Sequence, residues 1–128
     1  MPFDNPFEGA FGDIQILMDA RSHISSKGDW VKGCFRNCHR HCLVAALSVV
    51  AGSPNFNTPN RVERRLAGLL AAQLPSGSAF WARMRFFTAR QRLMWFNDDP
   101  RTKHEDVMAL FDRAVDHLTS RVPAYILA

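Results

Sequence analysis

The sequence predicts an all-α fold, a single compact, irregular bundle of four to five helices with at most one short extended segment. Three observations support this fold class. A length of 128 residues suits one hydrophobic core. Apolar residues recur at helical spacing in several separate stretches, and proline, glycine and asparagine gather between those stretches. We therefore expect one domain over residues 1–128, with residues 1–11 as an extended N-terminal arm.

The first half of the chain predicts two helices. Apolar residues at helical spacing predict the first between residues 13 and 25. The second is expected to begin near Asn37 or His41 and to end before Gly52, because glycine commonly follows the last helical residue. The connector between the two helices leaves room for a short extended segment at residues 30–36.

Two more helices are predicted in the middle of the chain. Thr58 and Pro59 suit the start of the third helix, because a threonine hydroxyl caps and proline fits the first turn. Pro75 ends that helix. Residues 80–96 mix aromatic and arginine side chains in a helical pattern, although a strand at residues 92–96 is an alternative.

The last helix has the clearest signals. Residues 97–100 are typical of a turn, and Thr102 with Glu105 has the pattern of a capping box, which predicts the start of the helix. The helix then carries one apolar stripe, with Asp112 and Asp116 outside it. The stripe consists of Val107, Leu110, Phe111, Ala114 and Leu118.

Two stretches of the chain carry a recognisable pattern. The matching residues are Trp30, Gly33, Cys42, Leu43, Ala46 and Leu47 in the first stretch, and 95–98, Thr102, 105–107, Leu110 and 112–114 in the second. Together they resemble an uncharacterised domain family of small helical proteins that is frequent in actinobacteria and their phages. The chain departs from the family pattern at Ala45, where glycine is typical, and at Phe96, which is inserted. The resemblance implies a helical fold and no established activity.

Charge is distributed unevenly along the chain, although the net charge is only +4. Residues 30–95 hold ten basic residues and a single acidic one, whereas both ends are net acidic. Either a polyanionic partner neutralises the middle, or the acidic ends fold against it, and Asp112 and Asp116 are candidates for the second role. The candidate residues for binding a polyanion are Arg61, Arg64, Arg65, Arg83, Arg85, Arg90 and Arg92.

These charges lead to the first functional hypothesis. In this hypothesis, the chain is a non-enzymatic regulatory or interaction module whose basic middle, residues 61–92, contacts an acidic protein or a nucleic acid. Aromatic residues between the arginines would allow bases to stack on them if the rings were exposed. No helix-turn-helix or other nucleic-acid-binding motif is present to support the nucleic-acid form.

Cysteine and histidine are concentrated in residues 34–42 and suggest an alternative, a metal site. Three thiols spaced four residues apart on a straight helix span about 12 Å, so one ion cannot bind all three. A zinc site that uses Cys38, Cys42 and either His39 or His41 is easier to form. We therefore expect no cofactor, with zinc at this site as the alternative.

Cys42 suggests another alternative, a thiol enzyme. In the first turn of a helix, its pKa would be lowered by the helix dipole and the unpaired amides. His104 or His117 would then act as the base, and Asn97 or Asp98 would orient it. This hypothesis places the Asn97–Asp98 segment beside Cys42. The structural alternative is that Cys42 is a small buried hydrophobic residue.

The N-terminus and the apolar runs bear on localisation. The first residues lack the basic and apolar regions of a signal peptide, and no apolar run is long enough to cross a bilayer. We therefore expect a cytoplasmic protein with reduced thiols and no membrane contact.

Overall fold

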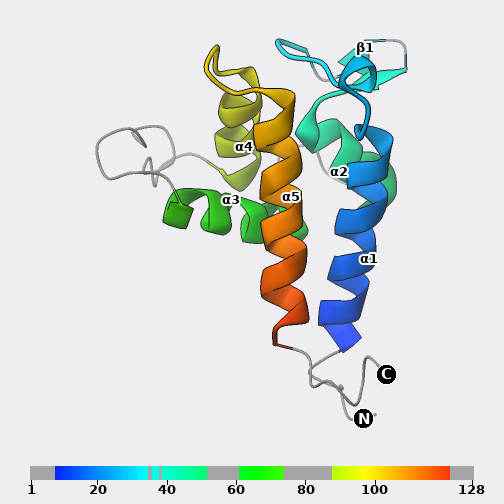
Figure 1. Ribbon diagram of the computed structural model, residues 1–128, viewed down its shortest axis with the longest axis vertical. Helices are drawn as coiled ribbons and strands as arrows, with labels where there is room; N and C mark the ends of the chain where they lie inside the picture. Colours follow the sequence, from blue (N-terminus) through cyan, green and yellow to red (C-terminus); the bar gives the residue numbers. More distant parts are fainter. Residues whose placement is uncertain (1–7, 35, 38, 52–60, 74–87, 122–128) are drawn as a thin grey trace.

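The computed structural model describes residues 8–34, 36–37, 39–51, 61–73 and 88–121. Its elements in chain order are α1 (Glu8–His23), the 3₁₀ helix η1 (Lys27–Asp29), β1 (Arg36–Asn37), β2 (Arg40–His41), α2 (Leu43–Ala51), α3 (Arg61–Gln73), α4 (Ala89–Asp98) and α5 (His104–Thr119). The described part is therefore an all-α bundle of five helices with one small hairpin (Figure 1), which confirms the predicted fold class. None of the helices in these ranges has the length and apolar character needed to span a membrane.

Helix α5 lies at the centre of the arrangement. It packs against α1 on one side and against α3 on the other, while α2 packs on α1 and α4 on α3. Figure 1 shows α1 and α5 side by side and running in opposite directions. Because α5 has neighbours on two sides, its exposed residues border two different helix–helix seams.

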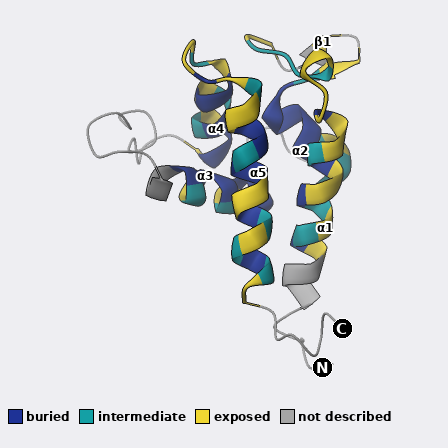
Figure 2. Cartoon of the chain, in the orientation of Figure 1, coloured by how far each residue is buried: buried dark blue, intermediate teal, exposed yellow. Residues whose placement is uncertain are grey.

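All five helices contribute to the core, with the largest shares from α2 and from the apolar stripe of α5. Five consecutive residues of α2, from Leu43 to Leu47, are fully buried, as expected for a helix enclosed by its neighbours. The predicted stripe of α5 is buried along its whole length (Figure 2), whereas Asp112 and Asp116 are exposed. The core also takes Leu17, Ala20 and Ile24 from the first helical segment.

The predicted starts of the first two helices were wrong, whereas the second helix ends at Ala51, directly before Gly52, as predicted. Helix α1 begins at Glu8, so residues 8–11 are helical and not part of an extended arm; residues 1–7 lie outside the described part. Helix α2 begins at Leu43, because the chain before it forms a hairpin in which Arg36 pairs with His41. The predicted extended segment therefore lies slightly later than residues 30–36.

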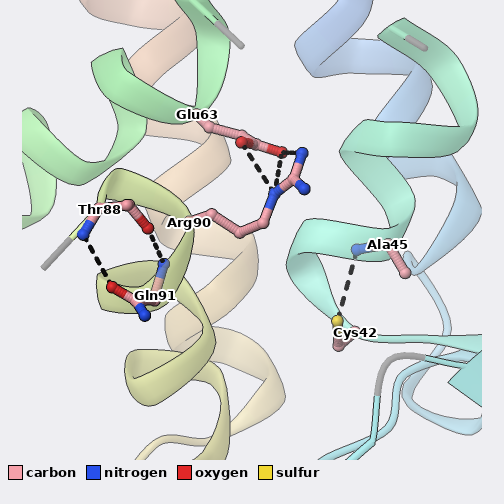
Figure 3. Close-up of polar contacts among 6 residues, drawn as sticks. All are labelled: Cys42, Ala45, Glu63, Thr88, Arg90 and Gln91. Atoms are coloured by element: carbon pink, nitrogen blue, oxygen red, sulfur yellow. Dashed lines mark hydrogen bonds and ion pairs between the residues drawn. The ribbon is translucent and has the colours of Figure 1, made fainter. Parts of the chain in front are cut away.

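Helix α4 begins at a capping box that sequence reasoning missed. The Thr88 hydroxyl accepts a hydrogen bond from the Gln91 amide at 3.1 Å, and the Gln91 side chain accepts one from the Thr88 amide at 3.0 Å (Figure 3). The alternative strand at residues 92–96 is wrong, since these residues are helical. The predictions at Thr58, Pro59 and Pro75 fall outside the described residues.

The segment between α4 and α5 also differs from its prediction. Asn97 and Asp98 belong to the last turn of α4, so the connection starts at Asp99. The predicted capping box of Thr102 and Glu105 is wrong by one residue, because α5 begins at His104 and Asp106 accepts a hydrogen bond from the Lys103 amide at 2.8 Å. The carboxylate of Asp106 thereby satisfies an amide at the helix start.

Candidate functional site

Asn97 is fully buried at the end of α4 and joins three segments of the chain. Its Oδ1 accepts hydrogen bonds from Trp30 Nε1 at 2.6 Å and from the Leu43 amide at 3.1 Å. Its Nδ2 donates to the Val31 carbonyl at 2.9 Å and to Asp98 Oδ1 at 3.0 Å. All four hydrogen-bonding positions of the side-chain amide are therefore used inside the fold.

Asp98 and its neighbours extend this network towards Gly33. The Gly33 amide donates to Asp98 Oδ1 at 2.8 Å, and Gly33 has a φ of +77°, a conformation that favours glycine. Lys32 Nζ donates to the Asp99 carbonyl at 2.7 Å and lies 5.4 Å from the centre of the Trp30 ring. These contacts hold the Trp30–Gly33 segment and the end of α4 in place against each other.

Cys42 lies immediately before α2 and is buried, with 2% of its surface exposed. Its Sγ accepts a hydrogen bond from the Ala45 amide at 3.4 Å (Figure 3). Burial raises the pKa of Cys42, and the amides of Ala45 and Val44 oppose that rise only in part. The direction is opposite to the lowered pKa that the thiol-enzyme hypothesis requires. The expected proximity is confirmed, since Asn97 binds the amide of the next residue, Leu43.

His104, the other member of the hypothetical catalytic group, is held by a different part of the chain. Its Nε2 donates to the Ile24 carbonyl at 2.6 Å, and its ring centre lies 5.7 Å from that of Trp30. Trp30 thus contacts both His104 and Asn97. The structure brings the four predicted catalytic residues into one region, where Asn97 and His104 both hold segments of the fold together.

The residues of the hypothetical zinc site are dispersed. His39 is exposed, with its Nε2 3.7 Å from Asp29 Oδ1, whereas the ring of His41 lies 6.1 Å from that of His23. Cys38 falls outside the described residues. Across the ranges that are described, no three His, Cys, Asp or Glu side chains come together in a way that could hold a metal ion.

Two arginines of the basic middle bind one buried carboxylate. Asp13 of α1 is fully buried, and its two oxygens lie 2.7 Å from Arg61 Nη2 and 2.9 Å from Arg65 Nε of α3. The acidic N-terminal part of the chain therefore does fold against the basic middle. The same role for Asp112 was a wrong prediction, because Asp112 pairs with Arg21 of α1 at 2.8 Å.

A third arginine of the basic middle is paired inside the bundle. Arg90 of α4, 4% exposed, makes an ion pair with the fully buried Glu63 of α3 at 3.2 Å (Figure 3). Three of the seven candidate arginines thus bind carboxylates of the same chain. Arg64 is exposed, Arg92 is half-buried, and Arg83 and Arg85 lie outside the described residues.

A small cleft of about 230 Å³ lies between α3 and α5. Its polar lining comes from Arg64 and Arg65 of α3 and His117 of α5. The rest of the lining is formed by Gly68, Leu69, Ala114 and Leu118. Cationic or titratable side chains of α3 (Arg64 and Arg65) and α5 (His117) thus meet beside an apolar floor. Sequence reasoning singled out Arg64 but not this cleft, because the two helices are brought together only by the fold.

The comparisons with known proteins identify a family and no activity. The model of a family of unknown function, DUF6197, matches residues 12–117. The chain belongs to this family. The match confirms the resemblance to an uncharacterised family and covers α1 from Gly12 on and α5 through His117. No curated protein and no solved structure matches the chain.

Proposed function

We propose that this DUF6197 domain is a non-enzymatic interaction module whose α3/α5 cleft receives an acidic, partly apolar segment of a partner protein. The observation that carries the proposal is the position of Arg64. It is an exposed arginine at a cleft whose floor includes Leu69 and Leu118. A guanidinium group can bind a carboxylate through two parallel hydrogen bonds, while the floor accommodates an apolar side chain.

An acidic protein suits this surface better than a nucleic acid. Nucleic-acid binding depends on several cations that each neutralise a phosphate. Arg61 and Arg65 already share the carboxylate of Asp13, and Arg90 binds Glu63. The described part of the cleft therefore offers Arg64 and, when it is protonated, His117. Few charges beside an apolar floor are typical of a site for a peptide.

The non-enzymatic part of the proposal is supported by the roles of the residues that were considered as catalytic. The side-chain amide of Asn97 is fully occupied in the fold, and a ring nitrogen of His104 binds the Ile24 carbonyl. Burial raises the pKa of the Cys42 thiol and thereby disfavours the nucleophilic thiolate. Each of these residues has a structural role that explains its position.

A peptide titration tests the proposal. The probe is a fluorescent helical peptide of leucine and glutamate with its leucines on one face, and binding is followed by anisotropy. Arg64→Ala should weaken binding about fivefold, the loss of roughly 1 kcal/mol of binding free energy. The matched control is Arg40→Ala, which removes an exposed arginine of β2 that does not line the cleft.

Two results would contradict the proposal. One is equal binding of the acidic peptide by the Arg64 and Arg40 variants. The other is tighter binding of a mixed-sequence DNA duplex than of the peptide, with a steep dependence on salt, because that behaviour is typical of phosphate contacts.

A further inference from the structure

We infer that the groove between α1 and α5 is a second docking surface, separate from the cleft above, and that its occupant is a basic amphipathic helix of a partner protein. The groove has a volume of about 600 Å³ and lies along the exposed side of the seam between the two helices. Four observations carry this inference: the shape of the groove, its exposed methionine, its continuation onto α2 and its charge.

The shape of the groove follows from helical spacing. Its α1 side includes Gln15, Met18 and Ser22, and its α5 side includes Asp112 and Val115. Residues three, four and seven positions apart lie on one face of a helix, so each helix presents a single stripe to the groove. Because the helices run side by side in opposite directions (Figure 1), the two stripes form a channel along their length. A third helix can pack its ridge into such a channel.

Apolar surface is exposed in the groove. Met18 leaves 50% of its surface exposed, although the residues next to it on the inner face of α1 are buried. Val115 of α5 is partly buried and lines the same groove. Methionine is flexible and polarisable, and exposed methionines are common where a protein accommodates the apolar face of a helix.

The apolar surface continues from the groove onto α2. Asp19 and Ser22 also line a neighbouring hollow of about 430 Å³, which contains Val49 and Val50. Val49 is 54% exposed. Met18 and Val49 therefore flank Asp19 on one continuous surface that is longer than the groove alone.

The negative charge of the groove favours a basic occupant. Asp19, Asp112 and Asp116 line it, and Arg21 is the one basic residue among the described residues of its lining. Arg21 binds Asp112 at 2.8 Å, whereas Asp116 has no side-chain partner in the described part of the chain. The groove is thus acidic in a chain whose net charge is +4. A lysine or arginine at the rim of an apolar helix face would pair with Asp116, whereas a nucleic acid or an acidic peptide would be repelled.

The test uses a helical peptide of leucine and lysine with its leucines on one face, titrated into ¹⁵N-labelled protein. The net positive charge of the protein opposes any unspecific attraction of this peptide. We expect amide shifts concentrated in residues 15–22 and 112–116. Asp116→Asn and Met18→Gln should each weaken binding about fivefold.

The matched control is Asp29→Asn, which removes one negative charge from η1, outside the groove. It should leave the affinity for the basic peptide unchanged. All variants change residues with exposed or half-buried side chains, and their thermal unfolding midpoints confirm that the fold is kept.

Three results would overturn the inference: no binding of the basic peptide at millimolar concentration, shifts that map outside α1 and α5, or equal weakening by Asp116→Asn and Asp29→Asn. The acidic peptide of the previous section distinguishes the two proposals, because its binding depends on Arg64 and not on Met18 or Asp116. Either proposal can therefore fail while the other stands.

Discussion

Asn97 shows how one side chain can hold distant parts of a chain together. It has no exposed surface, and its hydrogen bonds reach the connector after α1, the start of α2 and the adjacent Asp98. Truncating it would leave the Trp30 indole N–H, the Leu43 amide and the Val31 carbonyl without their partner. A buried polar group without a partner costs free energy, so this residue has a large effect on stability.

Asn97→Ala should lower the free energy of unfolding by about 3 kcal/mol, measured by urea denaturation. Asn97→Asp has the same shape and keeps the acceptor for Trp30, but it loses the donor to the Val31 carbonyl.

A double-mutant cycle isolates the hydrogen bond between Trp30 and Asn97. Trp30→Phe should lower the free energy of unfolding by about 1 kcal/mol less in the Asn97→Ala background than in the wild type. Equal costs in both backgrounds would contradict the role assigned to this bond.

The reactivity of the Cys42 thiol distinguishes the structural interpretation of this residue from the thiol-enzyme hypothesis. Cys34 is exposed and Cys42 is buried, so iodoacetamide at neutral pH should modify Cys34 rapidly and Cys42 at least about 100-fold more slowly. Peptide mass spectrometry after timed quenching measures both rates. Modification of Cys42 in the folded protein as fast as that of Cys34 would favour the enzyme hypothesis.

The raised pKa of Cys42 also predicts how stability changes with pH. The folded state holds the thiol proton more tightly than the unfolded state does. The neutral buried thiol therefore contributes fully to stability below the ordinary thiol pKa of 9.0, and this contribution is lost as the pH rises through the higher folded value. As the pH rises above 9.0, the free energy of unfolding of the wild type should therefore fall towards that of Cys42→Ala. A difference between the two proteins that stays constant or grows would contradict the assignment.

Among the elements, α3 and α4 are joined by a buried ion pair. Glu63 has no exposed side-chain surface and Arg90 only 4%. Glu63→Gln would remove the opposite charge that Glu63 supplies to the buried guanidinium group of Arg90, and we expect a loss of about 3 kcal/mol in the free energy of unfolding. Thermal and urea denaturation measure this loss.

Two further variants test the cause of that loss. Arg61→Gln removes a charge from an arginine whose side chain is 62% exposed, so it should cost less than about 1 kcal/mol. The double variant Glu63→Met/Arg90→Met should be more stable than Glu63→Gln alone, because it removes both buried charges. A double variant less stable than the single one would show that packing, and not charge, explains the loss.

The elements that could be predicted are those with a local signal. The apolar stripe of α5 and the end of α2 before Gly52 follow from local signals in the sequence, and both are confirmed. The start of α2 was wrong because Arg36 and His41 pair as a hairpin, which depends on contacts outside the helix. The start of α5 was wrong because Asp106 competes with Glu105 for the role of capping carboxylate, and spacing alone does not distinguish neighbouring residues.

The candidate site was predicted only in part, for the same physical reason. The Cys42–Asn97 proximity was expected and is confirmed through Leu43. The pairing of Asp13 with Arg61 and of Glu63 with Arg90 joins residues far apart in sequence, so the local excess of arginine did not reveal that these charges are neutralised. Arg64 can be told apart from the arginines that bind carboxylates only after these pairs are known.

For the molecule as a whole, α5 separates two surfaces of opposite character. On the α3 side, Arg64 and His117 border an apolar cleft. On the α1 side, Asp112 and Asp116 border a groove that exposes Met18. We propose that a domain of this kind brings two partners together, one acidic and one basic, on opposite sides of the same helix.

The most direct test is one ¹⁵N-resolved titration with the acidic and the basic peptide added in turn to the same sample of wild-type protein. We expect two separate sets of shifted amides, around Arg64, Leu69 and His117 for the acidic peptide and around Met18 and Asp116 for the basic one. The second peptide should bind with unchanged affinity after the first has saturated, apart from any direct association between the peptides, which a control titration without protein measures. Shifts of the same residues by both peptides, or no saturable binding of either, would contradict this expectation.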